Sequence, residues 1–161
     1  MGVPEYRGAM QHVERSARIP ASPEKVFDFV SDLDRLPDWQ SGIVSADLTS
    51  NGPIGVGSTA LVMRRLMGQS IRAPLTIVEY DPPRRLVIDG EVSGVRASAV
   101  LELAEADGGA TDLSFAMDIS ASGMTRFMEP MIAGAAGADI DQSLRTLVDC
   151  FSDDPPGPGS S

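Results

Sequence analysis

The chain has few of the side chains that build metal sites and nucleophilic catalytic units. Its 161 residues include one cysteine, Cys150, and one histidine, His12. A single cysteine cannot form an intrachain disulfide, and one residue of each type cannot complete a Cys/His zinc site. Any Ser-His-Asp or Cys-His unit would have to use His12. We therefore expect no metal and no cofactor, and the sequence leaves open whether the protein is an enzyme.

Long apolar runs and basic clusters are also missing. No stretch approaches the roughly 20 apolar residues that span a bilayer, and the N-terminal residues lack the apolar centre of a signal peptide. The formal net charge is −10, and adjacent arginines occur only as the pairs 64–65 and 84–85. An acidic surface repels phosphate groups. The sequence predicts a cytoplasmic protein with no nucleic-acid partner and no membrane insertion, and it leaves open a monomer or a homodimer.

The middle of the chain has the pattern of one globular domain. Residues 1–11 show no clear period and are expected to form a flexible N-terminal arm. Residues 153–161 are rich in Pro and Gly and are expected to form a disordered tail. No repeat or linker interrupts residues 12–152, which we assign to a single domain.

Alternating apolar residues predict strands, and residues typical of turns separate them. After the first strand, Ser22 suits the N-cap of a helix and Pro23 its first position. A second short helix is expected to end near Pro37. Apolar residues then recur at helical spacing over residues 124–151, with a kink expected at Pro130. The predicted strands cover residues 12–19, 43–48, 58–66, 71–80, 86–92, 95–103 and 111–119.

The connections between these strands are short, which implies antiparallel neighbours. A seven-stranded antiparallel sheet with the last helix lying across it satisfies every connection. The predicted class is therefore α+β.

Four segments in this order resemble the START-like SRPBCC superfamily, which includes polyketide cyclases/dehydrases, lipid-transfer domains and coenzyme-Q-binding proteins. They are residues 19–27 (IPASPEKVF), 34–39 (DRLPDW), 79–86 (EYDPPRRL) and 139–147 (DIDQSLRTL). The resemblance implies a helix-grip fold, in which the sheet wraps around the long C-terminal helix and two short helices follow the first strand. It also implies a cavity between that helix and the concave face of the sheet, with a mouth near Trp39. These segments are scaffold motifs and do not define the chemistry.

Three features of the residues fit a cavity that holds an apolar guest. Methionines are flexible and polarisable and suit a loosely defined ligand, although they also fill ordinary cores. The small residues 97–99 and 133–138 either allow two backbones to approach closely or leave space for a guest. Trp39 is either a core anchor or a wall of the mouth. The predicted ligand-binding residues are Phe27, Trp39, Ile43, Met63, Leu75, Ile88, Ala97, Ala99, Met117, Phe127, Met128 and Met131.

Polar residues in the strands give no catalytic constellation, and most are expected to face solvent. Arg15 and Arg65 share a strand face with apolar neighbours, so an inward guanidinium could orient a ligand carbonyl, carboxylate or enolate. Arg65, Glu91 and Tyr80 are the catalytic candidates.

The favoured function is binding, as a carrier or sequestering protein, of a hydrophobic small molecule such as a lipid, quinone or polyketide. The first alternative is a cofactor-free polyketide cyclase, dehydratase or aromatase, which would need an inward ionisable group with a shifted pKa. The second is a protein-interaction role, such as a stress or toxin–antitoxin component, which only the negative charge favours.

Overall fold

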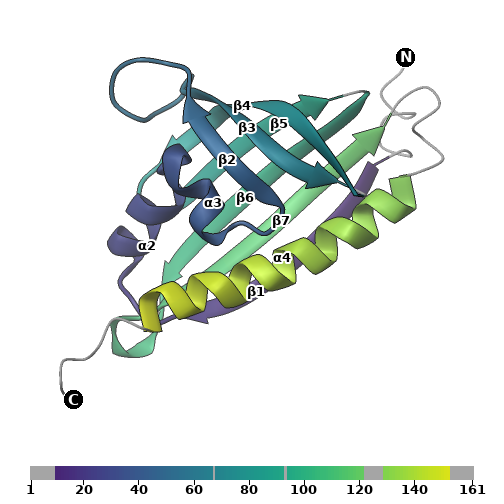
Figure 1. The fold of residues 1–161 in the computed structure, drawn as a ribbon. Helices are drawn as coiled ribbons and strands as arrows, with labels where there is room; N and C mark the ends of the chain where they lie inside the picture. Colours follow the sequence, from purple (N-terminus) through teal and green to yellow (C-terminus); the bar gives the residue numbers. More distant parts are fainter. Residues whose placement is uncertain (1–9, 67, 93, 122–128, 153–161) are drawn as a thin grey trace, which may run out of the picture.

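The computed structural model describes residues 10–66, 68–92, 94–121 and 129–152. Within them lies a strongly curved sheet of seven antiparallel strands in the order β1-β7-β6-β5-β4-β3-β2. The helix α4 lies across the concave face of this sheet, and the short helices α2 and α3 cover one end of it (Figure 1). This arrangement is the predicted α+β helix-grip architecture.

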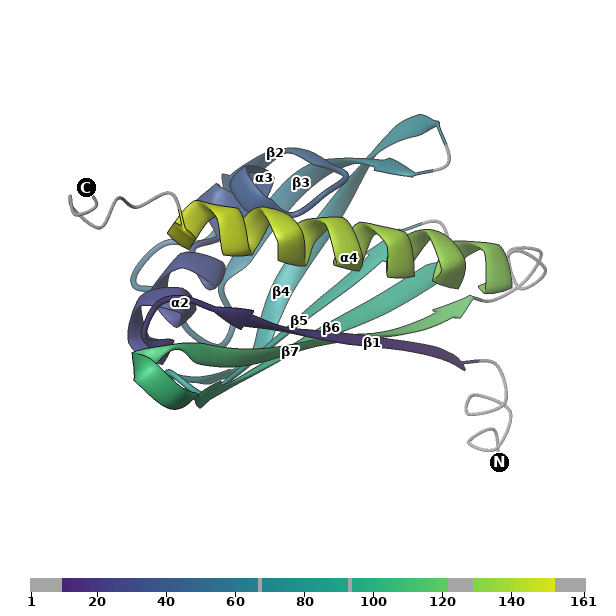
Figure 2. The same cartoon turned by 90° about the horizontal axis from the view of Figure 1, so that it is seen from below.

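The strands follow the alternation of the sequence closely, and each of them pairs with its neighbours in an antiparallel register. β1 and β2 are the two edge strands, and they lie on either side of α4 (Figure 2). The strands are β1 (Met10–Ile19), β2 (Ile43–Leu48), β3 (Thr59–Leu66), β4 (Gln69–Asp81), β5 (Arg85–Val92), β6 (Val95–Glu105) and β7 (Thr111–Ala121).

The first helix begins where the sequence predicts. α2 spans Pro23–Val30, and the Ser22 side chain accepts a hydrogen bond from the backbone N–H of Lys25. A short 3-10 turn, η1 (Leu33–Arg35), leads into α3 (Leu36–Trp39). Pro37 was expected to end this helix, but it lies at the start of α3. Proline is tolerated there because the first helical N–H groups have no intrahelical partner.

The long helix α4 spans Glu129–Ser152. A kink was expected at Pro130, but the residues that precede Glu129 lie outside the described ranges, so this stays a prediction. The predicted helical residues 124–128 lie outside the described residues, as do residues 1–9 of the predicted arm and the predicted tail 153–161. β1 begins at Met10, two residues earlier than predicted.

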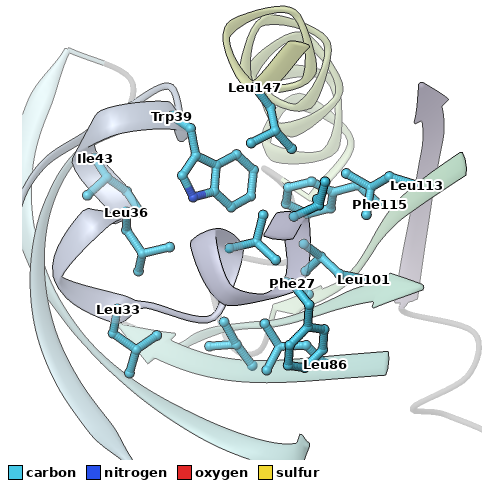
Figure 3. Packing of buried hydrophobic residues seen from close by; sticks show 14 of the residues in the cluster. Phe27, Leu33, Leu36, Trp39, Ile43, Leu86, Leu101, Leu113, Phe115 and Leu147 are labelled. Carbon is cyan, nitrogen blue, oxygen red and sulfur yellow. The ribbon is translucent and has the colours of Figure 1, made fainter. Parts of the chain in front are cut away.

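The hydrophobic core lies between the C-terminal half of α4, the short helices and one end of the sheet. Trp39 is 2% exposed, and its ring lies 5.9 Å from that of Phe115. Figure 3 shows both rings facing Leu147 of α4. Leu144 and Ile140 of α4 belong to the same cluster. The core therefore fixes one half of α4 to the sheet.

No helix in the described ranges is long and apolar enough to cross a membrane.

Candidate functional site

A cavity of about 120 Å³ lies between the N-terminal half of α4 and the concave face of the sheet. An engineered core cavity of about 150 Å³ stays dry and binds benzene, so this space matches one aromatic ring. Glu91 lines the cavity and is itself exposed, so the cavity reaches the surface beside the β5–β6 connection. Its lining consists of Leu36, Gln40, Ile43, Arg64, Ile71, Ala73, Leu75, Ile88, Gly90, Glu91, Val95, Ala97, Ala99, Met117, Ile119, Ile132, Ala136 and Asp139.

The strand register explains why space remains there. Leu75, Gly90, Ala97 and Ile119 are paired in turn across β4, β5, β6 and β7, and all four line the cavity. The two middle positions of this row carry almost no side chain. The cavity floor is therefore a trough, bounded by large side chains on β4 and β7.

Four polar side chains line the cavity, Gln40, Arg64, Glu91 and Asp139, and two of them form an oppositely charged pair. Arg64 Nη2 lies 4.0 Å from Asp139 Oδ2, and the side chains are 22% and 34% exposed. The distance to Asp139 is too long for a hydrogen bond, and the Arg64 guanidinium makes no hydrogen bond to any residue that the structure describes. Burial lowers the pKa of Arg64, an effect that the nearby Asp139 charge opposes. Burial also raises the pKa of Asp139, and the Arg64 charge and a Ser41 hydrogen bond oppose that shift.

The segment between α3 and β2 holds Asp139 in place. The Ser41 backbone N–H donates to Ser143 Oγ at 2.8 Å, and Ser143 Oγ donates to the Asp139 carbonyl at 2.6 Å. Gly42 has a φ of +91°, and a Cβ there would lie 3.4 Å from Asp139 Oδ2 and 3.6 Å from Arg64 Nη2. Positive φ favours glycine. Because glycine has no side chain, the segment can lie close to both charged groups at this position.

Half of the predicted ligand-binding residues line this cavity. Ile88, Ala99 and Met117 are paired across β5, β6 and β7, one row from the trough. The residues that line it as predicted are Ile43, Leu75, Ile88, Ala97, Ala99 and Met117, together with the catalytic candidate Glu91.

Three other predicted residues, Phe27, Trp39 and the catalytic candidate Tyr80, lie in or beside the hydrophobic core. Phe27 is 1% exposed, and its ring meets the Tyr80 ring edge-on at 5.4 Å. Trp39 is a core anchor and does not line the cavity, although its neighbour Leu36 does. The Trp39 indole N–H is buried and has no hydrogen-bond partner in the described part of the chain.

The prediction that Arg65 and Met63 face the cavity is wrong, because it assigned the inward face of β3 to the wrong set of alternating residues. The inward positions of β3 are Ala60, Val62 and Arg64, since the first two are buried and Arg64 lines the cavity. Arg65 is exposed on the other face of the strand, which it shares with Met63. Apolar residues occur on both faces of β3, so the pattern did not fix the phase, and a shift of one residue reverses every side chain.

The remaining predicted residues lie away from the cavity or outside the described ranges. Met131 is 61% exposed on α4. Phe127 and Met128 lie outside the described residues. Arg15 is exposed, and its Nε donates to Asp141 Oδ1 at 3.1 Å, which links β1 to α4. An ideal Cβ at Gly137 would lie 3.1 Å from Arg15 Nη2, so a glycine lets this guanidinium lie against the helix.

His12 lies on the outer face of the sheet. Its Nδ1 lies 2.5 Å from Asp118 Oδ1, and its Nε2 lies 3.2 Å from Glu14 Oε1. Hydrogen bonds to these two carboxylates raise the pKa of His12 above 6.5. In the part of the chain that the structure describes, no group of three or more His, Cys, Asp or Glu side chains could hold a metal ion.

A larger hollow of about 520 Å³ has only Gly90, Glu91 and Ala97 in common with the lining of the cavity. Its other lining residues include Thr76, Asp89 and Ser98, which alternate with the cavity-lining positions. This hollow is an open, polar surface and gives no enclosed apolar space. The cavity under α4 is therefore the better candidate site.

Sequence reasoning missed the polar pair and the particular α4 residues that line the cavity. Ile132, Ala136 and Asp139 follow one another at spacings of four and three, which places them on one helix face. That spacing was available in the sequence. The inward position of Arg64 could be predicted only by knowing which alternating residues of β3 face the cavity.

The chain belongs to the family described as polyketide cyclase / dehydrase and lipid transport, whose model matches residues 10–151. This match confirms the predicted superfamily, and the fold agrees with it.

Similar proteins include one from Mycobacterium tuberculosis named Toxin Rv0910, which is 26% identical over 146 residues, covering 89% of this chain and 99% of that protein. A START superfamily protein from Mycobacterium smegmatis has a TM-score of 0.75 at 14% identity, covering 88% of this chain and 97% of its own. The Zhui aromatase/cyclase from Streptomyces sp. R1128 has a TM-score of 0.73 at 14% identity, covering 93% of this chain and 98% of its own. At such identities the two structures show a shared fold.

Proposed function

We propose that the chain binds an apolar small molecule in the cavity under α4, and that the molecule carries an oxygen acceptor next to Arg64. The observation that carries this proposal is a half-buried guanidinium that lines an apolar cavity without a hydrogen bond to any described residue. A buried charged group without hydrogen bonds is costly. A ligand carbonyl, carboxylate or enolate would supply the bonds that Asp139 is too far away to make.

The size of the cavity limits what enters it. About 120 Å³ is well below the ~300 Å³ at which drug-sized pockets begin. One ring or a short chain fills it, and the rest of a larger lipid, quinone or polyketide would extend past Glu91 into solvent. Met117 is unbranched and flexible, so its movement would admit a larger group.

The test compares an acid with its neutral counterpart, 4-methylbenzoate with p-xylene, by calorimetric titration. A hydrogen bond to a charged group contributes about 1.5–3 kcal/mol, so the acid should bind at least about tenfold more tightly. Arg64→Met should remove this preference. Arg65→Met is the matched control, because Arg65 is the adjacent arginine on the opposite face, and it should keep the preference. Equal effects of the two substitutions, or no binding of either probe, would refute the proposal.

A second candidate is a cofactor-free cyclase or dehydratase. The specific observation is Asp139, a carboxylate at the cavity whose pKa is raised by burial and which lies beside a cation. Such a group could accept a proton from a carbon between two carbonyls while Arg64 stabilises the enolate that forms. Aldol turnover of a poly-β-keto substrate that is lost in Asp139→Asn, with ligand binding retained, would establish it. Turnover equal to that of the unchanged protein would exclude this role.

A further inference from the structure

Gly90 occupies the middle of β5, and its backbone does not require a glycine. Its φ lies outside the left-handed region, unlike those of the turn glycines. A glycine inside a strand is destabilising relative to alanine, because it loses more backbone freedom on folding. Glycine in such a place marks a close approach by another group, and here that group can be identified.

The close approach is made by Leu75. A Cβ added at Gly90 would lie 2.8 Å from Leu75 Cδ2, a separation that real Cβ atoms essentially never show. Leu75 is the residue paired with Gly90 across β4 and β5, and both line the cavity. The leucine side chain therefore leans over the glycine.

This contact sets the width of the trough. Leu75 Cδ2 occupies the space that a side chain at position 90 would take, so the end of the leucine side chain lies against the floor of the trough. On the other side of Gly90, Ala97 continues the floor toward Ile119. A side chain at position 90 would lift Leu75 off the floor, and the open space that can receive it is the cavity.

We propose that Gly90 and Leu75 together determine the size of ligand that the protein accepts. This inference rests on the proposed binding function and adds a selectivity rule to it. Gly90 keeps Leu75 out of the cavity, so a methyl group at position 90 should exclude larger ligands while small ones still bind.

The experiment measures the affinity of a series of 4-alkylbenzoates, from methyl to butyl, for the full chain and its variants by calorimetric titration. Gly90→Ala should leave binding of the shortest members nearly unchanged and weaken the longest that the unchanged protein binds by about tenfold or more, the usual effect of one methylene in a pocket. Leu75→Ala should extend the accepted length. The double variant Gly90→Ala/Leu75→Ala should recover the members that Gly90→Ala loses.

Gly134→Ala is the matched control. It adds the same methyl group at a glycine on α4 that has nothing within 4 Å and does not line the cavity. It should leave the whole affinity series unchanged. If Gly90→Ala does not fold, the extended range of Leu75→Ala still tests the rule.

The outcomes separate the two proposals. If the unchanged protein binds no member of the series, the proposed function fails. If it binds the series but Gly90→Ala loses no long member, or the double variant recovers none, the size rule fails while the binding function stands. An unaltered length limit in Leu75→Ala also overturns the rule.

Discussion

Replacing Ala99 with valine should stabilise the protein, because Ala99 borders empty space. At about 24 cal/mol per Å³, a cavity of about 120 Å³ corresponds to about 3 kcal/mol, which is the most that filling it could return. Valine adds two methyl-sized groups, and each is worth about 0.8 kcal/mol when buried. We therefore expect the free energy of unfolding to rise by about 1.6 kcal/mol, and Tm by about 3–6 °C for a chain of this size. Ligand affinity should fall at the same time.

The control is Ala60→Val, which makes the same change in the packed core. Ala60 is 1% exposed on the inner face of β3 and does not line the cavity. Added volume in a filled core costs about 1–3 kcal/mol, so this variant should lose stability. Urea denaturation of both variants measures the two signs. If Ala99→Val loses stability as Ala60→Val does, the space beside Ala99 is not available and the cavity argument is wrong.

Four further measurements test other parts of the structure. Asp139→Asn removes the negative charge beside Arg64 and should strengthen binding of an acidic probe by about fivefold, the value of roughly 1 kcal/mol for a partly exposed ion pair; weaker binding would contradict this. Since the folded-state pKa of Asp139 is raised above 3.8, its ionisation removes stability as the pH rises through the window above that value, and Asp139→Asn should abolish this part of the decline in urea titrations. The pKa of the single histidine, followed by NMR, should exceed 6.5, so the stabilisation by His12 is present below that pH and is lost as the pH rises through the higher folded value; Asp118→Asn should lower this pKa. Trp39→Phe should cost less than the about 3–5 kcal/mol of a truncation to alanine in urea denaturation, because it keeps an aromatic ring beside Phe115 and removes a buried N–H that has no described partner.

The fold was largely predictable because its elements depend on local patterns. In β6 and β7 one face is apolar and the other polar, so the alternation defines both the strands and their orientation. The N-cap at Ser22 follows from a side-chain type that suits one backbone position. Pro37 was misjudged because proline is compatible with the start of a helix as well as with the position just after its end.

The site was harder to predict because it depends on which residues leave space unfilled. Ala97 and Ala99 were identified as small, but only the register across the sheet shows that Gly90 lies beside Ala97. The phase of β3 could not be read from a strand with apolar residues on both faces, so Arg65 was chosen in place of Arg64. The closeness of Arg64 and Asp139 depends on the path of residues 41–42, which tertiary contacts determine.

The two halves of α4 have different surroundings, the hydrophobic core for one and the cavity for the other. Ile140, Leu144 and Leu147 belong to the packed core, whereas Ile132 and Ala136 only roof the cavity. Substitutions in the first half of the helix can therefore reshape the cavity without disturbing the core contacts of the second half. Such a separation makes the protein a practical scaffold for redesign, because new specificity can be sought at one end of a single helix while the other end preserves the architecture.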